Sequence, residues 1–337
     1  MALGLGAIQT TVAPARKTRE VIRNTWSVAS ITAWLCTMAS TWPRAWPLFI
    51  PLAVIVSIIA CGLFKMPTRS VRWVVAIFSQ AVVVIEVPKA AAHTCHLQGG
   101  FDPDNWQILG ATPESFKISQ DSEAFIAGRG VQILKTCTPY LAGNVPKKGD
   151  HCAWMESSAV VYCNSVIGAR TNTEGRESTS AAMLTGVIPD WGFHREENRF
   201  GSHLIDVEFE IESVMDWGML GYFVGDAVQE RIPVLSGRFT GADLLIRHKH
   251  FGAAAASSGG VEMYHIAGIT PEAPSLEAAF GGRKPLEVIS YGLAERRRTY
   301  ENLNSKASDS QVDFVMLGCP HYSLEQIRSA ADRKSVV

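Results

Sequence analysis

Residues 136–175 read TCTPYLAGNVPKKGDHCAWMESSAVVYCNSVIGARTNTEG, and this stretch governs how the rest of the chain is interpreted. Three cysteines, Cys137, Cys152 and Cys163, stand among hydroxyl, amide and small side chains. Apolar runs such as Ala159–Tyr162 are too short to form more than brief buried strands or helical turns. Glycine, proline and asparagine between these runs let the backbone turn sharply and approach a ligand closely. Because function concentrates in loops held by a rigid frame, the stretch predicts an active-site region.

The overall composition argues against several functional classes. The chain has 337 residues, enough for a sizeable core and for two domains. Its formal net charge is −1, so no global basic field favours nucleic-acid binding. Seven cysteines, an odd number without regular spacing, argue against a disulfide-stapled secreted module. In a reducing compartment such cysteines are metal ligands, nucleophiles or, most often, small core residues.

The first 99 residues differ in character from those that follow. Residues Trp46–Phe64 carry no charge. As a helix they would extend about 28 Å at ~1.5 Å per residue, close to the ~30 Å of a bilayer core. Three interpretations stay open: a membrane anchor, a buried helix pair of a soluble core, or a segment foreign to the ancestral domain. An anchor would make the chain membrane-associated, and otherwise we expect a cytoplasmic protein.

From Gly100 onward the sequence is typical of an α/β protein. His203–Ile211 alternates apolar and charged residues as a half-buried strand does, and Gly218–Gln229 is interpreted as a helix. Ala253–Ala256 precedes Ser257–Gly260, which we interpret as a Gly-rich turn. Strands alternating with helices predict a partly parallel, layered sheet covered by flanking helices. Further strands are expected at Val131–Leu134, Leu286–Ser290 and Asp313–Leu317, and further helices at residues 180–190 and Ala294–Ser305.

Two junctions between a strand and a loop resemble each other. Ile133–Tyr140 and Val315–Ser323 each deliver a cysteine, Cys137 or Cys319, at the end of a buried run, with proline one or two residues later. In open α/β sheets, ligands bind at the carboxyl ends of the strands. The two thiols could therefore converge on one iron or iron–sulfur centre, a group that thiolates suit. The alternative is a pair of buried core cysteines.

A dense set of short polar side chains follows Cys137 in a segment that otherwise looks buried. Buried polar groups must find partners, and a polar ligand would supply them. Arg170 suits a carboxylate or a phosphate because its planar guanidinium makes bidentate contacts. Ser257 and Ser258, with the glycines after them, could add backbone N–H groups to an anion site. The set comprises Glu156, Ser157, Ser158, Asn164, Ser165, Arg170, Thr171 and Asn172.

Three other residues of the stretch, and His194 beyond it, have simpler interpretations. Cys152 and Cys163 lie in apolar surroundings, where a core role is the better interpretation. His151 and His194 are interpreted as hydrogen-bonded loop histidines, with roles as ligands or proton donors as the alternative.

Three motifs resemble the large-subunit core of aconitase X enzymes: residues 136–175 as quoted above, SSGGVEMYHIAGITPEA at 257–273 and GCPHYSLEQ at 318–326. The resemblance runs from about Gly100 to the C-terminus. It implies a hydro-lyase of the aconitase superfamily that removes water from a small hydroxy acid such as cis-3-hydroxy-L-proline or 5-phosphomevalonate. It also implies an iron or iron–sulfur cofactor and a small swivelling-domain subunit as partner.

Carried over by motif, the resemblance assigns roles to particular residues. Cys137 and Cys319 would be the metal ligands, and iron would act as a Lewis acid on the leaving hydroxyl. A serine or an acid of the pocket would remove the proton. The catalytic candidates are Glu156, Ser157 and Ser158, and the substrate-binding candidates are Asn164, Ser165, Arg170, Thr171, Asn172, Ser257 and Ser258.

The chain also departs from the family pattern. We expect residues 100–337 to be a catalytic core that is incomplete at both ends, preceded by a segment outside the family. We expect this sequence to lack two parts of the family pattern, the region of a third cysteine ligand and the small swivelling domain. Two alternatives to an active dehydratase follow: an inactive or membrane-tethered fragment that retains the fold, and an iron–sulfur binding module without turnover.

Overall fold

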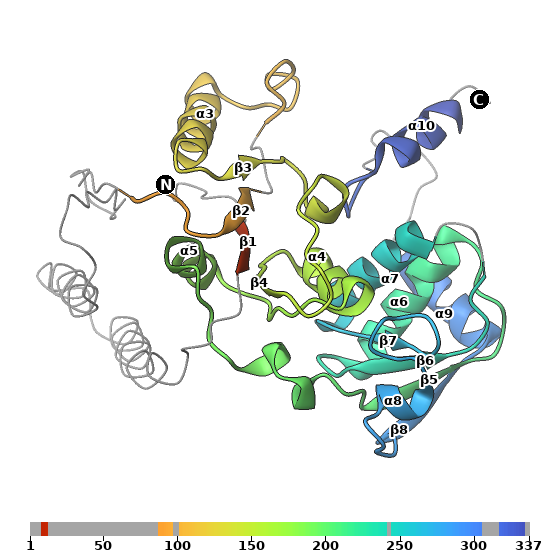
Figure 1. Cartoon of the computed structure of the whole chain (residues 1–337). Helices are drawn as coiled ribbons and strands as arrows, with labels where there is room; N and C mark the ends of the chain where they lie inside the picture. The colour runs from red at the N-terminus through yellow and green to blue at the C-terminus, as the bar shows by residue number, and fades with distance from the viewer. Residues whose placement is uncertain (1–7, 13–86, 97–100, 241–243, 305–316, 334–337) are drawn as a thin grey trace, which may run out of the picture. The chain divides into compact units, whose positions relative to one another are not determined.

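The structure, a computed structural model, describes residues 8–12, 87–96, 101–240, 244–304 and 317–333 (Figure 1). The chain divides into two compact units, Met1–Pro14 with Lys89–Val337 and, separately, Ala15–Pro88, and every described helix and strand belongs to the first unit. The apolar run predicted at Trp46–Phe64 lies outside the described residues. Within the described ranges, no helix has both the length and the apolar character that a membrane crossing requires.

A four-stranded sheet in the order β3-β2-β1-β4 carries the region around Cys137. β1 runs antiparallel to both β2 and β4, whereas β2 and β3 are parallel. Two of its strands come from the segment 1–99 that the sequence analysis set apart from the core. The strands are β1 (Ile8–Val12), β2 (His93–His96), β3 (Gln132–Ile133) and β4 (His151–Ala153).

Three helices accompany this sheet, and their starts follow simple capping rules. α3 (Pro113–Ala127) begins with proline after Thr112, whose side chain accepts a hydrogen bond from the backbone N–H of Ser115. α4 (Ser157–Tyr162) is short and continues into a π-helical turn, Cys163–Ile167. Such turns are frequent at functional sites. α5 spans Arg176–Thr185.

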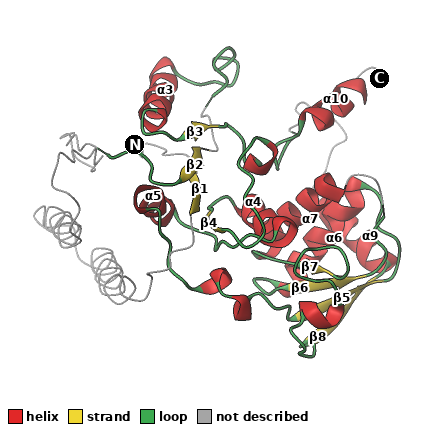
Figure 2. Cartoon of the chain, in the orientation of Figure 1, coloured by secondary structure: helices red, strands yellow, loops and turns green. Residues whose placement is uncertain are grey.

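The second sheet is entirely parallel and has the order β7-β6-β5-β8 (Figure 2). Leu204 of the central strand β5 pairs with Val234 on one side and Val288 on the other. Parallel strands need crossover connections, which helices supply here. The elements are β5 (His203–Val207), α6 (Val214–Val228), β6 (Pro233–Ser236), α7 (Leu244–Gly259), β7 (His265–Ile266), α8 (Leu276–Ala279), β8 (Glu287–Tyr291), α9 (Leu293–Asn304) and, after a gap, α10 (Leu324–Arg333).

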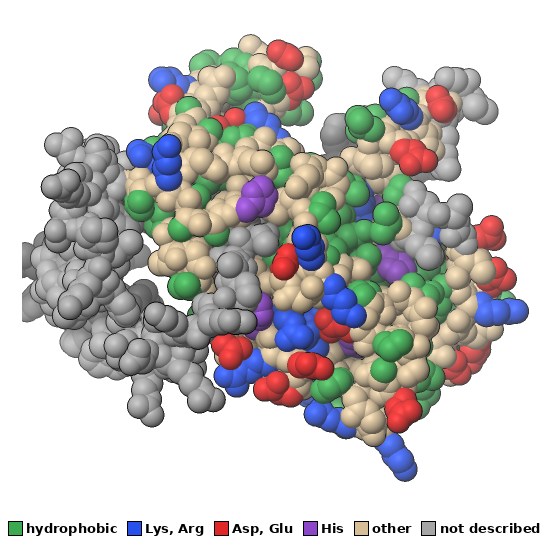
Figure 3. All heavy atoms as spheres, viewed as in Figure 1, with side chains coloured by type: hydrophobic (Ala, Val, Ile, Leu, Met, Phe, Trp, Pro, Cys, Tyr) green, Lys and Arg blue, Asp and Glu red, His purple; other side chains and the backbone are tan. Residues whose placement is uncertain are grey.

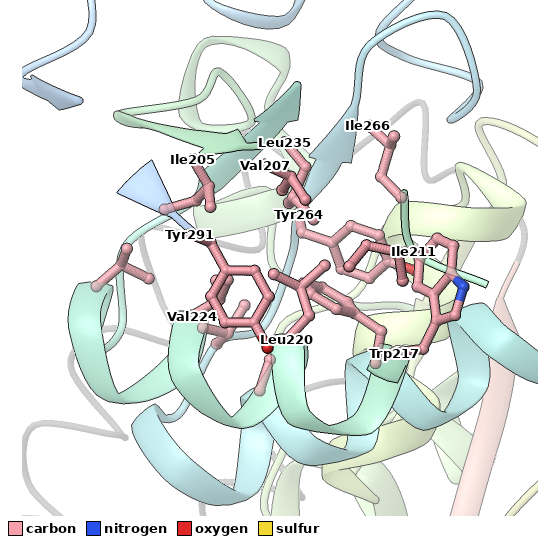
Figure 4. Close-up of a cluster of buried hydrophobic side chains, with 14 of the residues drawn as sticks. Ile205, Val207, Ile211, Trp217, Leu220, Val224, Leu235, Tyr264, Ile266 and Tyr291 are labelled. Atoms are coloured by element: carbon pink, nitrogen blue, oxygen red, sulfur yellow. The ribbon is translucent and has the colours of Figure 1, made fainter. Parts of the chain in front are cut away.

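The main hydrophobic core lies between this sheet and helices α6 and α7 (Figure 4). Ile205 and Leu235 point from the sheet toward Trp217 and Leu220 of α6, and all four side chains are fully buried. Burial of such side chains contributes roughly 1.5–3 kcal/mol each. The core therefore fixes α6 and α7 against the sheet.

Helices α6 and α7 touch through their backbones. A Cβ atom added at Gly225 would lie 2.4 Å from the carbonyl oxygen of Ala255, and one added at Gly259 would lie 1.8 Å from the carbonyl oxygen of Gly225. At Gly221 an added Cβ would lie 2.4 Å from the carbonyl oxygen of Phe251. Glycine is required at these positions because any side chain would separate the helices.

The sequence predicted most of the second sheet, but one predicted turn was wrong and one strand was missed. The Gly-rich turn predicted at Ser257–Gly260 was wrong up to Gly259, because α7 continues through that residue. The small side chains there fit against α6, so they extend a helix instead of ending it. β6 was not predicted, and the strand expected at Asp313–Leu317 lies outside the described residues except for Leu317, which is not in a strand. The strands near His203 and Leu286, and the helices near Gly218 and Ala294, are confirmed with shifted ends.

The surface agrees with the balanced charge of the sequence. On the face seen in Figure 3, Lys and Arg side chains alternate with Asp and Glu side chains and form no continuous basic area. A nucleic-acid-binding surface would gather positive charge along one face.

Candidate functional site

Cys137 contacts the segment that leads into α10. The thiol follows β3 in a loop before a short 3₁₀ turn, Pro139–Leu141, and is buried. The backbone N–H of His321 donates to Cys137 Sγ at 3.2 Å. In return, the backbone N–H of Cys137 donates to His321 Nδ1 at 3.3 Å. Two segments 184 residues apart are thus joined by a reciprocal pair of hydrogen bonds (Figure 1).

Cys319 and Glu156 lie close enough to Cys137 for their charges to act on its thiol. Burial raises the pKa of the Cys137 thiol, and the backbone N–H of His321 lowers it. The negative charges of Glu156 and Cys319 raise this pKa further, whereas the positive charge of Lys249 lowers it. These groups act on the thiol only because they lie near it. Cys319 is exposed, so the pair has one buried and one accessible thiol.

Tyr140 is a further candidate near Cys137 that was not among the predicted site residues. It is 7 % exposed, and its ring stacks on that of Tyr162 with a centroid distance of 3.8 Å. Its hydroxyl has no hydrogen-bond partner among the described residues. Burial, then the nearby Tyr162, Glu156 and Cys137, raise the pKa of this phenol well above its usual value. A buried Tyr normally finds a partner for its O–H, so a polar group is expected beside Cys137. The position three residues after Cys137 was the available signal.

Glu156 and Ser158 are bound to each other at the start of α4. The Glu156 carboxylate accepts hydrogen bonds from the backbone N–H groups of Ser158 and Ala159 and from Ser158 Oγ at 2.7 Å. Asp and Glu stabilise helix N-termini in this way. Ser157, the third catalytic candidate, is exposed. Glu156 therefore has a structural role at this helix in addition to lying near Cys137.

Asn164 and its neighbours are satisfied by the protein itself. Asn164 is fully buried, donates to the carbonyl oxygens of Thr171 and Glu262, and accepts from the backbone N–H of Thr171. Thr171 Oγ1 in turn accepts from the backbone N–H of Trp154, and Ser165 Oγ accepts from that of Tyr264. Three predicted substrate-binding residues thus hold loops together, and binding by them stays a prediction.

Arg170 and Asn172 hold a second loop. Arg170 Nη1 donates to the carbonyl oxygen of His194 at 2.8 Å. Asn172 Oδ1 accepts from the backbone N–H of Phe193 at 2.9 Å. Both side chains therefore fasten residues 190–195, and ligand binding by them is again untested.

Ser257 and Ser258 differ from the prediction. Their hydroxyls donate to the carbonyl oxygens of Ala253 and Ala254 at 2.8 and 2.9 Å, within α7. The anion site predicted from a Gly-rich turn has no structural basis here, because the backbone N–H groups of a continuing helix are used inside the helix.

His151 and His194 form a close pair. Their Nδ1 atoms are 2.9 Å apart and the rings are stacked. Burial most, and then the neighbouring His151 and Arg199, together lower the pKa of His194 to about 4. Burial also lowers the pKa of His151. A 2.9 Å contact needs one donor and one acceptor, so at least one ring is neutral.

We expect this pair to make stability depend on pH. An unfolded histidine takes up a proton near its ordinary pKa of 6.5, whereas folded His194 does so only near 4. The unfolded chain therefore binds more protons in this window, and the free energy of unfolding falls as the pH falls from about 7 to 4. Each such histidine contributes up to about 1.4 kcal/mol per pH unit.

Replacing His194 with Asn should reduce the dependence of the free energy of unfolding on pH. The slope should fall by the amount for about one proton, up to ~1.4 kcal/mol per pH unit, in urea unfolding measured between pH 7 and 5. His93, which is exposed, is the control, and His93→Asn should keep the original slope. Equal slopes in wild type and His194→Asn would contradict the prediction.

The described residues supply an incomplete ligand set for a metal. Among them, no group of three or more His, Cys, Asp or Glu side chains could hold a metal ion. Cys137 and Cys319 offer two thiols, and thiolates are the ligands that iron–sulfur centres take. Such a centre usually has four thiolate ligands. The hydroxyl of Tyr140, which lacks a hydrogen-bond partner among the described residues and is affected by the charge of Cys137, is a further polar group near that thiol. The donor chemistry fits iron, and further ligands would have to come from outside these side chains.

Comparison with known proteins identifies the family. Sequence models of the aconitase X first domain and aconitase X second domain match residues 58–197 and 201–301. The first match starts inside the segment where the sequence analysis expected no resemblance.

The chain is 40 % identical over 232 residues to the phosphomevalonate dehydratase large subunit of Methanothermobacter thermautotrophicus, covering 69 % of this chain and 56 % of that protein. It is 39 % identical over 207 residues to the cis-3-hydroxy-L-proline dehydratase of Pseudomonas aeruginosa, covering 60 % of this chain and 35 % of that enzyme. The chain thus spans at most a little over half the length of these two relatives.

A solved structure agrees with the sequence comparisons. The crystal structure of Thermococcus kodakaraensis aconitase X in its holo-form superposes with a TM-score of 0.61 at 33 % identity, covering 73 % of this chain and 59 % of that one. The mixed α/β fold with a parallel sheet and flanking helices is therefore that of an aconitase-like protein. On these grounds the chain belongs to the aconitase X family.

Proposed function

We propose that this chain provides the catalytic core of an aconitase X-type dehydratase, a hydro-lyase that removes water from a small hydroxy acid. The observation that carries the proposal is the junction of Cys137 with the Cys319–His321 segment. Relatives named as phosphomevalonate and cis-3-hydroxy-L-proline dehydratases support the reaction class. Either hydroxy acid is a candidate substrate. A small subunit is the proposed partner, since the archaeal relatives are named as large subunits.

Cys137 and Cys319 are the proposed ligands of an iron or iron–sulfur cofactor. When bound, such a centre would supply a Lewis acid for the leaving hydroxyl. The side chains around the thiols suit an anionic, oxygen-rich substrate. The Tyr140 hydroxyl can donate a hydrogen bond to a substrate oxygen, and Lys249 adds positive charge. Elimination also needs a base for the proton on the adjacent carbon, and Glu156, the carboxylate whose charge raises the pKa of Cys137, is the candidate.

The test is iron binding by the full chain, reconstituted anaerobically with ferrous iron and sulfide. Cys137→Ser and Cys319→Ser should each lower the iron retained per chain at least tenfold and remove the visible thiolate-to-iron absorption. Cys163→Ala is the control, because Cys163 is a fully buried core residue. It should retain iron as the wild type does.

Iron retention unchanged by both serine variants would overturn the proposal. Dehydration of cis-3-hydroxy-L-proline and of 5-phosphomevalonate, each with and without an added small subunit, then tests turnover. Iron binding without turnover on either substrate would favour an iron–sulfur module instead of an enzyme.

A further inference from the structure

Lys249 is a buried lysine that donates hydrogen bonds to the segment carrying Cys319. We infer that Lys249 is a positioning residue that ties residues Cys319–Gln326 to α7 and so holds Cys319 beside Cys137. The inference deepens the proposed function, because it concerns the same two thiols. It also stands on contacts that do not depend on any metal.

Lys249 makes two hydrogen bonds to the segment that carries Cys319. Its Nζ atom donates to the carbonyl oxygen of His321 at 2.6 Å and to Gln326 Oε1 at 2.7 Å. The backbone N–H of the same His321 donates to Cys137 Sγ. A continuous path of hydrogen bonds therefore runs from α7 through His321 to the buried thiol.

Two adjacent residues of α7, Lys249 and His250, contact the side-chain amide of Gln326. Gln326 Oε1 accepts from Lys249, and Gln326 Nε2 lies 2.7 Å from Nε2 of His250. Gln326 Oε1 also accepts from the backbone N–H of Ser323 at 3.1 Å. Both ends of this amide are thus engaged, so the first turn of α10 has a fixed position on α7.

The Lys249 side chain is buried. Lys249 is only 2 % exposed, and among the described residues it forms no ion pair with a carboxylate. Taking an ammonium group out of water costs several kcal/mol. Its two neutral oxygen partners, both from the Cys319–Gln326 segment, are therefore the groups that offset this cost. Loss of these contacts would favour release of the segment from α7.

The experiment measures how readily Cys137 and Cys319 can be joined. The full chain, freed of metal with a chelator, is treated with dibromobimane, which links neighbouring thiols, and the linked peptides are identified by mass spectrometry. Lys249→Met keeps the length of the side chain but donates nothing, and it should slow formation of the Cys137–Cys319 link at least fivefold. Lys284→Met is the matched control, because Lys284 is exposed, and its rate should equal that of the wild type.

Two further variants separate positioning from a general loss of structure. Lys249→Arg retains a cation with several donors and should recover at least half of the wild-type linking rate. Gln326 is half-buried, and Gln326→Ala removes the Oε1 atom that accepts from Lys249. This variant should slow formation of the Cys137–Cys319 link without changing the urea midpoint of unfolding. A wild-type rate in both Lys249→Met and Gln326→Ala would overturn the inference.

The result is independent of iron binding. If the chain fails to bind iron while Lys249→Met still slows linking, the dehydratase proposal fails and the positioning role stands. If the chain binds iron but Lys249→Met does not slow linking, the dehydratase proposal stands and the positioning role of Lys249 fails.

Discussion

Replacing Arg199 with Met is expected to lower the free energy of unfolding by about 3–5 kcal/mol. The Arg199 side chain is 2 % exposed and makes a bidentate contact with Glu272 at 2.8 and 2.9 Å. It also donates to the backbone carbonyl oxygens of Asn164, Ala169 and Phe193. Methionine fills much of the volume but donates nothing, so the carboxylate and three carbonyls would lose their donors. Urea unfolding followed by circular dichroism measures the change.

Arg195 provides the control for this prediction. Its contact with Asp190 is 3.6 Å long, and both side chains are about half exposed. Exposed pairs contribute 0–1 kcal/mol, so Arg195→Met should stay within about 1 kcal/mol of the wild type. An Arg199→Met variant as stable as Arg195→Met would show that relaxation or water satisfies the groups that Arg199 contacts.

The large effect expected at Arg199 follows from its place in the chain. It lies between the residues matched to the two aconitase X domains, 58–197 and 201–301. Asn164 belongs to the first of these ranges and Glu272 to the second, and Arg199 bonds to both. One guanidinium therefore joins the π-helical turn that follows α4 to the parallel-sheet domain.

Replacing Gly225 with Ala should also destabilise the protein, by roughly 1–3 kcal/mol or more. The added methyl group would lie 2.1 Å from Ser258 Oγ and 2.4 Å from the carbonyl oxygen of Ala255. Ser258 could rotate away, but the Ala255 backbone could move only with α7. Differential scanning calorimetry or urea unfolding would record the loss, with a lower midpoint expected in either method.

Gly218, in the same helix, provides the control for Gly225→Ala. A Cβ atom there meets nothing within 4 Å. Alanine is a better helix former than glycine by about 1 kcal/mol, so Gly218→Ala should stabilise the protein. The same substitution is thus predicted to act with opposite signs at two positions of α6. Stabilisation at both positions would mean that α7 yields easily and that the backbone contact is not required.

Two apolar runs in the sequence, each followed by a cysteine, predicted that Cys137 and Cys319 lie at one sheet edge. The structure describes hydrogen bonds between Cys137 and His321, two residues after Cys319. The run expected before Cys319 lies outside the described residues apart from Leu317, so a shared sheet edge stays a prediction. Lys249 could not be predicted in the same way. It stands in LLIRHKHFG, where a lysine normally reaches solvent, and its two hydrogen-bond acceptors, in His321 and Gln326, lie 72 and 77 positions further along the chain.

The polar set around Asn164 shows a second limit of sequence. A run of buried hydroxyls and amides must have partners, but the composition does not say whether a ligand or the protein provides them. Asn164, Ser165 and Thr171 find their described partners in the backbone of nearby loops. Tyr140, with its hydroxyl lacking a described partner, differs from them only in tertiary surroundings.

Glycine in the sequence was similarly ambiguous. The pair Gly259–Gly260 predicted a turn, yet only Gly260 has the left-handed conformation, with φ of 74°. Gly259 is glycine because Gly225 passes directly against it. A contact between two glycines at positions 225 and 259, in different helices, has no local sequence pattern by which to recognise it.

That backbone contact between α6 and α7 has a mechanical consequence. With no side chain between Gly225 and Gly259, neither helix can roll or slide along the other without the main chains colliding. The two helices must move as one rigid body. Since Lys249 is part of α7, any breathing motion that widens the space around Cys137 from that side has to displace α6, and the buried tryptophan at position 217 with it.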